Sequence, residues 1–531
     1  MSPSSSSAPS VFSRGPNLNL RNMTFLSNPN VEISIPGIQG PAGNFVRSFS
    51  TLDRIEGTVN ILSKTDIRFD DLEISFNGVE KTFVDKLSST TAMAGRSEST
   101  HRFLKLQQPI RNEDLPQPRI LAAGRLYSFP FTFVVPSQLL PKSCGHKTTH
   151  ENVKNAHLQL PPSFGVPELS GFGSSLLDDL SPDMSRVTYS IKAILVRNRD
   201  DGSDAVLVEA TRKLRIKPVF EEQPPLDIDG ISDEYCHRQE KSIRKGVFKG
   251  KLGRLVIEAG QPKSFRLPAL PPGAELPPIS TMAKVVLRFD PAEEHSPPPR
   301  LSSLSSKIKV TTFYASVPRR DFPDRASSLT DMSAGYISDM ISLSSMCVAS
   351  VEWKKHESWE SPVTRRDSAL STASALTMNS NTLSAAVIPD PSASYHGKLF
   401  YTATILVPIF LPKTKHLVPT FHTCLISRVY GLHLSLSTHG SPFGPSLSVR
   451  VPVQISSEGS VGANERRRET EQREQAILDV DAAFEPRNVA PPNEQYMGQS
   501  QILPPSYSSF QQQMGGGALS RERGAQGVPV F

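Results

Sequence analysis

The stretch GRLYSFPFTFVVP, Gly124–Pro136, decides the fold class. Its large apolar side chains fall on every second residue, at Tyr127, Phe129, Phe131, Phe133 and Val135. Successive side chains of a β-strand point to opposite faces, so this spacing predicts a strand with one buried face. Pro130 falls on the other face. Because proline cannot donate a ladder hydrogen bond, we expect an open edge or a break there.

The same period of two continues along the chain on both sides of this stretch. Upstream, the alternation covers short stretches at 57–62, 67–76 and 101–106. It slips by one residue between Asp70 and Asp71, which predicts a bulge or bend. Downstream, the apolar stretches 187–198 and 205–216 flank the turn-type cluster RDDGSD, which predicts a β-hairpin.

A second series of strand-like stretches follows, with the same alternation. It comprises 253–259, 283–289, 307–317, 347–353, 398–412, 422–438 and 446–455. Many short strands separated by turn signals indicate β-sandwiches rather than a parallel α/β sheet. We therefore predict an all-β fold with two immunoglobulin-like β-sandwich lobes, the first over 26–218 and the second over 248–458.

Other segments do not fit a core. Proline makes up 46 of 531 residues, and hydrophobic residues make up 37%, below the ~45–50% of ordinary globular chains. This composition indicates a core diluted by disordered segments. We expect a disordered N-terminus over 1–25 and a disordered tail over 459–531, in which 464–484 could form a short charged helix. Between these ends we expect a basic inter-lobe linker over 219–247 and a Ser/Thr-rich insertion over about 320–394.

Cysteine usage and the lack of targeting signals favour the cytoplasm. The cysteines are widely spaced and form no disulfide pattern: Cys144, Cys236, Cys347 and Cys424. The N-terminal residues lack a basic segment followed by an apolar one, so we expect no signal peptide. The longest apolar run, FYTATILVPIFLP, is shorter than the ~20 residues that a membrane span needs.

The net charge of +6 is mild for the length and does not argue for nucleic acid. Its distribution is uneven, because the segment 236–254 alone holds seven Lys/Arg residues and one Glu. These basic residues are Arg238, Lys241, Arg244, Lys245, Lys249, Lys251 and Arg254. The segment is either a solvated linker or a contact for acidic lipid or an acidic peptide, and the sequence leaves both interpretations open.

No catalytic motif is complete. The string GVFKGKL, 246–252, has three residues between its glycines where a phosphate-binding loop needs four. The string GFGSSL, 171–176, lacks the third glycine of a dinucleotide-binding turn. The sequence contains neither H-E-x-x-H nor G-x-S-x-G. We therefore expect a protein without catalytic residues or cofactor.

The string CGHKTTH contains the residue types that bind zinc. Cys144, His146 and His150 lie in it, and His157 follows. However, a single residue separates Cys144 from His146, and there is no second cysteine pair nearby. We therefore interpret the segment as a polar loop between strands and predict no metal site.

Several strings resemble the α-arrestins, the arrestin-related trafficking adaptors of fungi. They are YSFPFTFVVPSQLLPKSC (127–144), AHLQLPPSFG (156–165), SPDMSRVTYSIKAILVR (181–197), KGKLGRLVIEAGQPKSFRLP (249–268) and KVTTFYASVP (309–318). The resemblance covers roughly 25–458, apart from the Ser-rich insertion. It implies an arrestin fold and a non-enzymatic adaptor that recruits a HECT-type ubiquitin ligase to plasma-membrane transporters or receptors. It also implies a cytoplasmic protein peripherally bound at the plasma membrane or endosomes.

The resemblance gives meaning to the string LPPSYSSF, 503–510, near the end of the chain. In this family a P-P-x-Y motif binds a WW domain of the ligase, and Pro504, Pro505 and Tyr507 match that motif. Adjacent prolines favour a polyproline II conformation, which WW domains dock in aromatic-lined grooves. The alternative is a chance match in a proline-rich tail. Several α-arrestins carry two motifs, and PPNEQY, 491–496, does not match, so ligase binding could be weaker here.

The resemblance also suggests roles for two other segments. Arrestins bind acidic stretches of cargo tails and anionic membrane, which would suit the basic segment 236–254. The string RRDS, 365–368, has the form of a basic-directed kinase site, so Ser368 is a possible phosphosite. The alternative is an unmodified loop.

Two other functions remain open for an arrestin-like chain. One is a signalling scaffold, such as an ambient-pH sensing arrestin, and the other is a retromer-like sorting subunit that needs no ligase. The P-P-x-Y string argues against the sorting subunit. Cargo separates the ligase adaptor from the signalling scaffold, because loss of an adaptor leaves a particular transporter at the cell surface after its down-regulation signal.

Overall fold

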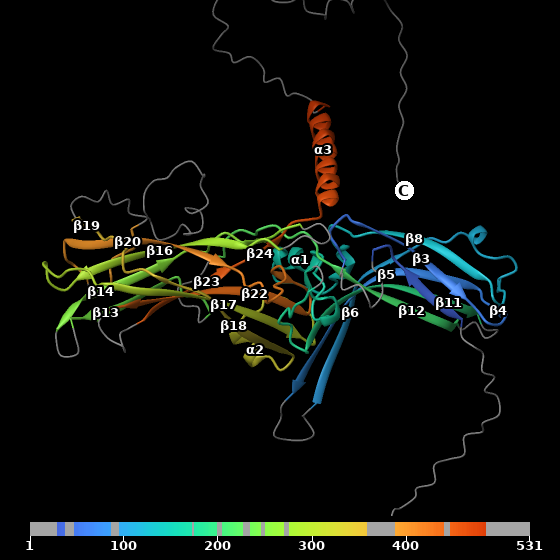
Figure 1. Cartoon of the computed structure of the whole chain (residues 1–531), viewed down its shortest axis with the longest axis horizontal. Helices are drawn as coiled ribbons and strands as arrows, with labels where there is room; N and C mark the ends of the chain where they lie inside the picture. Colours follow the sequence, from blue (N-terminus) through green and yellow to red (C-terminus); the bar gives the residue numbers. More distant parts are fainter. Residues whose placement is uncertain are drawn as a thin grey trace, which may run out of the picture. The chain divides into compact units, whose positions relative to one another are not determined.

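Strands dominate the part of the chain that the structure describes. The structure is a computed structural model, and it describes residues 29–37, 47–86, 95–172, 175–198, 204–226, 234–245, 250–269, 276–357, 388–393, 395–439 and 446–484. Figure 1 shows the strands gathered into β-sheets, with few helices. The predicted all-β fold class is confirmed.

The N-terminal half, residues 29–226, contains strands with short helices between them. The strands are β1 (Asn30–Ser34), β2 (Ser48–Phe49), β3 (Arg54–Leu62), β4 (Ile67–Arg68), β5 (Asp71–Lys86), β6 (Gly95–Gln107), β7 (Ile120–Leu121), β8 (Leu126–Val134), β9 (Gly171–Phe172), β10 (Ser175–Leu176), β11 (Ser185–Asn198) and β12 (Asp204–Ile216). The helices are η1 (Asn112–Asp114), η2 (Pro141–Ser143), α1 (Glu151–Leu158) and η3 (Pro167–Leu169).

The larger sheet of this half has the strand order β2-β12-β11-β5-β6. Strand β11 pairs antiparallel with both β12 and β5, so the predicted hairpin of β11 and β12 is confirmed. The side chains of β11 alternate between buried and partly exposed from Val187 to Leu195. Tyr189 lies on the buried face, and its hydroxyl donates to the Pro161 carbonyl at 2.6 Å. The bonded hydroxyl is thereby tolerated in the core.

A second sheet has the order β1-β3-β8, so β8 lies at its end among the described strands. Phe129, Phe131 and Phe133 of β8 are buried, whereas Pro130 is exposed. The edge predicted from Pro130 is confirmed. The expected slip at Asp70 is also present, because β4 pairs with β7 and the chain then bends into β5, which pairs with β11.

The C-terminal half, residues 234–457, is also built of strands. They are β13 (Arg238–Arg244), β14 (Lys251–Ala259), β15 (Phe265–Leu267), β16 (Ser280–Pro291), β17 (Leu301–Ala315), β18 (Ala334–Cys347), β19 (Lys354–Glu357), β20 (Leu399–Phe410), β21 (Phe421–His422), β22 (Ile426–Thr438), β23 (Leu447–Val453) and β24 (Ile455–Ser457). A short helix, α2 (Arg325–Thr330), precedes β18. One sheet has the order β13-β14-β16-β20-β19, and the other has the order β18-β17-β22-β21, with β23 paired to β22.

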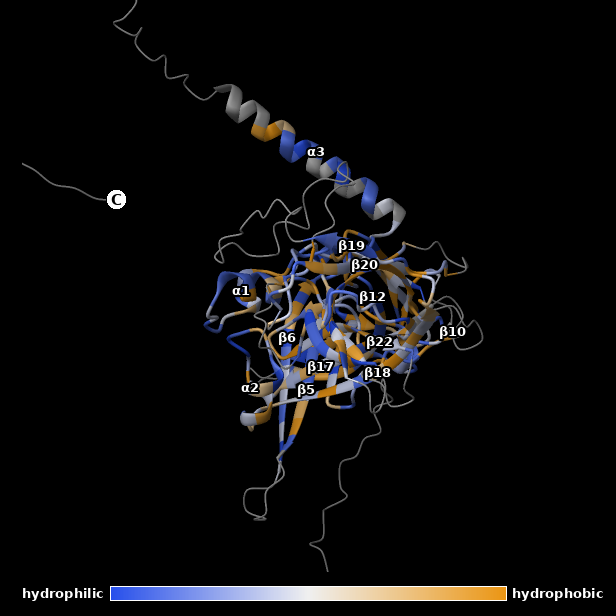
Figure 2. Cartoon of the chain, turned by 90° about the vertical axis from the view of Figure 1, so that its left-hand side faces the viewer, coloured by the Kyte–Doolittle hydropathy of each residue, from blue (hydrophilic) through white to orange (hydrophobic). Residues whose placement is uncertain are grey.

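The buried apolar side chains form two cores. The second core lies within the C-terminal half and includes Phe289, Ile308 and Leu434. The first core belongs mainly to the N-terminal half, but it also contains residues that precede or begin β22: Val418, Phe421, Cys424, Leu425 and Ile426. Figure 2 shows hydrophobic residues along the strands of the sheets. The connection between β20 and β22 therefore links the two halves through apolar burial.

The predicted linker 219–247 is wrong for its basic part. Residues Arg238–Arg244 form β13, which pairs antiparallel with β14. Ile243 explains why a charged segment joins a sheet, because its side chain is 6% exposed and packs in the second core.

The predicted insertion 320–394 is also wrong in part. Its first third contains α2 and the long strand β18, which pairs with β17 from Ser303 to Ala315. Strand β18 is rich in serine and largely exposed. The strand predicted at 347–353 is wrong too, because β18 ends at Cys347 and β19 begins at Lys354. Residues 358–387 lie outside the described part.

The charged helix predicted at 464–484 is confirmed as α3, Val461–Phe484. Figure 2 colours much of it hydrophilic, with a hydrophobic band. Ile477 and Leu478 of this helix are exposed. The chain divides into one compact unit up to Thr470 and another from Glu471. Within the described residues, no helix combines the length and apolar character needed to cross a membrane.

Candidate functional site

The structure describes only some of the predicted site residues. Pro504, Pro505 and Tyr507 of the P-P-x-Y string lie outside the described residues, as do Ser368 and Lys249. The other basic residues of 236–254 are described, and they lie on β13, on β14 and at the end of β13. The described part of the chain includes the basic strand pair and the contacts between the two halves.

The strands β13 and β14 carry most of the described basic side chains of 236–254. In the antiparallel register, Ser242 faces Arg254 and Arg244 faces Lys251. β13 is the end strand of its sheet, so its outer edge has no partner among the described strands. Residues separated by two along a strand share a face, which places Lys241 beside Gln239 and Ile243 rather than beside Arg244.

Carboxylates neutralise part of this basic group. Arg238 pairs with Glu258 and approaches Glu240 at 3.8 Å, and Arg254 pairs with Glu240 at 2.7 Å. Lys245 pairs with Glu293 at 2.8 Å. These ion pairs lower the net attraction that the strand pair can exert on an acidic partner.

Other basic residues of the group are free to face an acidic partner. Lys241 donates to the Ser446 carbonyl at 3.3 Å, and within the described residues no carboxylate pairs with it. Arg244 and Lys251 are exposed. We call Lys241, Arg244 and Lys251 the exposed basic group. The exposed basic group thus contains three of the seven basic residues that the sequence indicated. Their contact with an acidic partner stays a prediction.

A cavity of about 530 Å³ adjoins β14. Lys251, Arg254, Tyr395, His396 and Lys398 are among the residues that line it. Asp290 and Glu294 also line it, so its charge is mixed. Asp290 is already paired with Arg288 at 2.8 Å in a buried position. The cavity could hold part of a polar peptide, but it shows no convergence of nucleophile and base.

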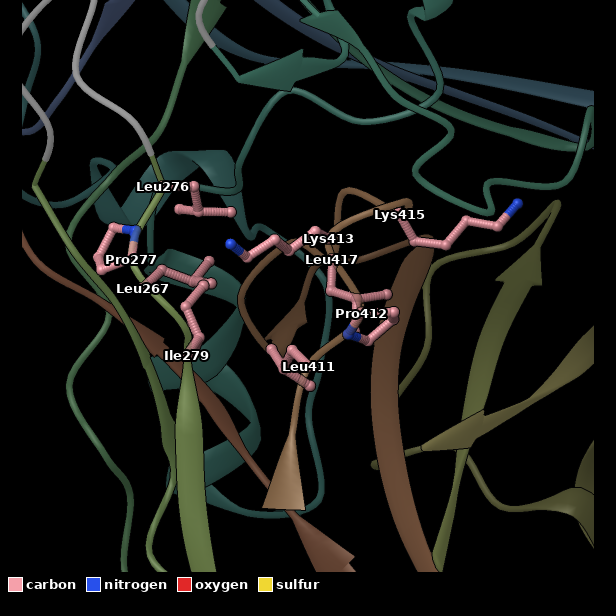
Figure 3. A pocket seen from close by; sticks show the side chains of 9 residues that line it. All are labelled: Leu267, Leu276, Pro277, Ile279, Leu411, Pro412, Lys413, Lys415 and Leu417. Carbon is pink, nitrogen blue, oxygen red and sulfur yellow. The ribbon is translucent and has the colours of Figure 1, made fainter. Parts of the chain in front are cut away.

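A smaller pocket lies beside β15 and β16. It has a volume of about 10 Å³, roughly the space that one water molecule needs. Figure 3 shows Leu267, Ile279 and Leu417 around it, while the side chain of Lys415 points away. Lys415 pairs with Asp178 of the N-terminal half at 2.8 Å. This pocket is too small for a cofactor, and all the residues that line it belong to the C-terminal half.

Buried polar side chains connect the halves. Arg428 on β22 is 1% exposed. Its guanidinium donates to the carbonyls of Leu180 at 3.0 Å and Asp179 at 2.8 Å, and it also bonds Thr312. A buried guanidinium needs such partners because desolvation of an unpaired charge is costly. Arg428 therefore ties the second half to a loop of the first.

Glu80 on β5 makes a second polar link. Its carboxylate is fully buried and bonds the His101 ring at 2.7 Å, and it accepts from the Thr423 hydroxyl. The hydrogen bond that the His101 ring donates to Glu80 raises the pKa of His101, which favours the charged imidazolium. Thr423 lies in the turn between β21 and β22. This carboxylate therefore holds a turn of the C-terminal half against the N-terminal half.

Next to this turn, the structure gathers a cluster of cysteines and histidines. Potential ligand atoms of Cys144, His146, His157 and Cys424 all lie within 4.8 Å of one another. The Cys144 sulfur is 3.3 Å from Nε2 of His146 and 3.6 Å from Nδ1 of His157. We call these four residues the Cys/His cluster. His146 is partly exposed, and the other members are buried.

Burial sets the protonation of the Cys/His cluster. It lowers the pKa of His157 to about 4, so this imidazole is neutral at pH 7. It raises the pKa of the Cys144 and Cys424 thiols. Thiols with raised pKa values are protonated and poor nucleophiles unless a cation stabilises the thiolate. The two thiols of the cluster are therefore poor nucleophiles in this state.

Cys144 and His146 lie in a loop, as the sequence indicated, but Cys144 is buried; the expectation of no metal site stays a prediction. These residues meet His157, which α1 brings back toward them, and Cys424 from the other half. His150 precedes α1 and is not in the Cys/His cluster. Cys424 is 280 positions from Cys144, so no local spacing could reveal it. The available signal was the mixture of one cysteine and three histidines within 14 residues, 144–157.

The chain was compared with known proteins. No protein-family model matches it. Bypass of stop codon protein 5 of Saccharomyces cerevisiae is 26% identical over 238 residues. The match covers 36% of this chain and 46% of the yeast protein, so the chain spans about half the length of the curated relative that it matches. The chain is thus distantly similar to part of this yeast protein.

Proposed function

We propose that this protein is an arrestin-like adaptor without catalytic activity of its own. It recruits a WW-domain HECT ubiquitin ligase to plasma-membrane transporters or receptors, and so promotes their ubiquitination and endocytosis. The observation that carries the proposal is the P-P-x-Y string, Pro504, Pro505 and Tyr507, on a chain whose body is all-β. The resemblance of the strand sequences to α-arrestins and the partial similarity to the yeast protein support it.

The position of the string suits recruitment of a ligase. Pro504 comes 20 positions after Phe484, the last residue of α3. A chain of that length reaches at most about 70 Å when fully extended. A ligase bound at Tyr507 is therefore tethered near any cargo held by the β-sheets, and tethering raises its effective concentration at the cargo's lysines.

The exposed basic group supports the cargo side of the proposal. Lys241, Arg244 and Lys251 are exposed on the strand pair β13 and β14. Their charges would attract an acidic cytosolic tail or an anionic membrane surface. The neutralised residues Arg238 and Arg254 would instead keep β13 folded onto β14 through their carboxylate partners.

The proposal is tested by a pull-down of the full chain with isolated WW domains. Tyr507→Ala removes the ring that fills the second WW pocket, and we expect recovery to fall at least tenfold, the equivalent of about 1.4 kcal/mol. Tyr496→Ala is the matched control, because PPNEQY has two extra residues before its tyrosine. Equal recovery of wild type and Tyr507→Ala would remove the central claim.

A cell experiment then separates the adaptor from a signalling scaffold. In cells that carry Tyr507→Ala, we expect at least one transporter to remain at the surface after its down-regulation signal. Surface biotinylation of membrane proteins measures this. Unchanged surface levels of all transporters, together with retained WW binding by the wild type, would favour the scaffold.

A further inference from the structure

The Cys/His cluster has the composition of a structural zinc site. Cys144, His146 and His157 come from the N-terminal half and Cys424 from the C-terminal half, which makes two cysteines and two histidines. Zinc in structural sites takes four such ligands in a tetrahedral arrangement. Tetrahedral S/N ligand sets favour zinc over magnesium or calcium, which prefer oxygen.

The two distances from the Cys144 sulfur to the histidine nitrogens fit one tetrahedral ion. Zinc–sulfur bonds of ~2.3 Å and zinc–nitrogen bonds of ~2.0–2.1 Å place a sulfur and a nitrogen ligand about 3.5 Å apart. The sulfur of Cys144 lies 3.3 Å from Nε2 of His146 and 3.6 Å from Nδ1 of His157. We propose that Cys144, His146, His157 and Cys424 bind one zinc ion that joins the two halves of the protein.

The surrounding contacts hold each ligand of the N-terminal half in place. Cys144 directly follows η2, and Ser143 at the end of η2 donates its hydroxyl to the Phe103 carbonyl of β6 at 2.8 Å. His157 is on α1, whose buried face includes Val153 and Leu158. The Nδ1 atom of His146 lies 3.3 Å from the Lys147 carbonyl. Donation from Nδ1 leaves Nε2 with a lone pair for the metal, as outer contacts of zinc-binding histidines commonly do.

The turn that carries Cys424 is held independently. Thr423 donates its hydroxyl to the buried Glu80 carboxylate, and its backbone N–H donates to the Ile426 carbonyl at 2.7 Å. The Cys424 carbonyl accepts from the N–H of Arg319 at 2.9 Å. Cys424 is therefore presented to the three ligands of the other half without needing the ion to order the turn.

Two other uses of these residues fit less well. Glu80, His101 and Cys424 also lie within 4.8 Å of one another, but the carboxylate of Glu80 is already engaged by His101 and Thr423. A disulfide between Cys144 and Cys424 would involve neither His146 nor His157. Both cysteines are free in the structure.

The site has a structural rather than a catalytic role. Four protein ligands fill a tetrahedral ion and leave no position for water or substrate. Cys424 is 280 positions from Cys144, so the ion closes a long loop and joins both halves at the first core. Removal of the ion should loosen the junction of the halves and leave the second core intact.

The metal content of the purified full chain tests the proposal. After reconstitution with zinc chloride and gel filtration, we expect about one zinc ion per chain by inductively coupled plasma mass spectrometry. The variants Cys144→Ser and Cys424→Ser should each fall below about a tenth of an ion per chain. The double variant Cys236→Ser/Cys347→Ser is the matched control and should keep its zinc, because neither cysteine belongs to the cluster.

A second measurement uses only the wild-type protein, in case the ligand variants do not fold. Cobalt(II) should give the intense visible absorption of a tetrahedral ion and a thiolate charge-transfer band, and both should vanish when zinc is added. An octahedral cobalt spectrum, or less than about a tenth of a zinc ion per wild-type chain, would overturn the proposal. A Cys144–Cys424 disulfide found by peptide mapping under reducing purification would overturn it as well.

Discussion

His433 lies on β22 between two cationic neighbours. In the sheet register it faces Lys307 of β17 on one side and Arg450 of β23 on the other. Burial lowers the pKa of His433 to about 4, and the charges of Lys309, Arg450 and Lys307 add to the effect. A histidine whose pKa is lower in the folded state than in the unfolded state destabilises the fold in acid.

We therefore expect the melting temperature to fall as the pH drops from about 6.5 to about 4, because the unfolded chain binds the His433 proton over that window and the folded chain does not. The variant His433→Gln should fall less steeply over the same window. Calorimetry at several pH values measures the difference between the two slopes.

His439→Gln is the matched control for this prediction, since His439 is an exposed histidine just after the end of the same strand. Its slope should equal that of the wild type. If His433→Gln also matches the wild type, the cationic neighbours of His433 do not act on it as described.

Cys424 shows how one side chain takes its meaning from distant contacts. Alone in the sequence, it is one of four scattered cysteines. In the structure it is 3% exposed, packs in the first core and lies beside Cys144 and His157. Free cysteines are often simply small buried hydrophobic residues. Here the two imidazoles next to it favour a metal ligand.

Among the elements, β13 shows that charge does not exclude a strand. Its residues alternate poorly in hydrophobicity, yet Ile243 anchors it in the second core and Arg238 pairs with Glu258 across to β14. Exposed ion pairs of this kind contribute about 0.2–1 kcal/mol each. Backbone pairing with β14 therefore supplies much of the stability of β13.

The exposed basic group on this strand pair leads to a binding prediction. We expect the triple variant Lys241→Gln/Arg244→Gln/Lys251→Gln to bind phosphatidylserine vesicles on the order of 100-fold more weakly than the wild type, since each basic residue near an anionic surface contributes about 1 kcal/mol. Vesicle co-sedimentation at low and high salt measures both affinity and its salt dependence.

The control variant removes the same charge elsewhere. Lys64, Lys81 and Arg102 are exposed residues of the N-terminal half, and their replacement by glutamine should leave vesicle binding nearly unchanged. Similar losses in both variants would point to net charge alone. Unchanged binding of the Lys241, Arg244 and Lys251 variant would contradict the membrane role of β13 and β14.

At the scale of the whole molecule, the two halves share the first core. Phe421 belongs to the C-terminal half but is 1% exposed in the first core. Its ring meets the ring of Phe164 edge-on, with centroids 5.7 Å apart. Phe164 in turn exchanges backbone hydrogen bonds with Val187 of β11. The two halves therefore cannot separate without exposing apolar surface.

We predict that Phe421→Ala lowers the free energy of unfolding by about 3–5 kcal/mol. Because the lost packing lies against Phe164, amide exchange at Val187 should also accelerate. Hydrogen–deuterium exchange of the full chain measures this effect in the half that does not contain the substitution.

The comparison variant is Leu436→Ala, a fully buried residue of the second core. We expect it to destabilise by about 2–5 kcal/mol and to leave the exchange at Val187 unchanged under native conditions. If Phe421→Ala leaves Val187 equally protected, then the first core does not couple the halves.

Much of the fold was predictable from local patterns. The alternation of Phe129, Phe131 and Phe133 identified β8, and Pro130 correctly placed it at an edge. The turn cluster RDDGSD identified the hairpin of β11 and β12. Strand β18 escaped prediction because its serines carry no apolar alternation. It is held by pairing with β17, a contact that its own residues do not encode.

The candidate sites also differ in whether the sequence alone could identify them. The P-P-x-Y string is a continuous peptide motif, so Pro504, Pro505 and Tyr507 could be identified from sequence alone. The exposed basic group required the structure, which showed that Glu240, Glu258 and Glu293 neutralise their basic neighbours.

The amino-acid order alone was enough for the all-β class, the hairpin and the docking motif, because each depends on residues a few positions apart. The tertiary structure decided three further features: the pairing of β13 and β18, the sharing of the first core, and the meeting of Cys144, His146 and His157 with Cys424. One physical reason explains why the sequence alone could not reveal these three features. Backbone pairing, apolar burial and metal coordination act through space, and residues 280 positions apart become neighbours only when the sheets have packed.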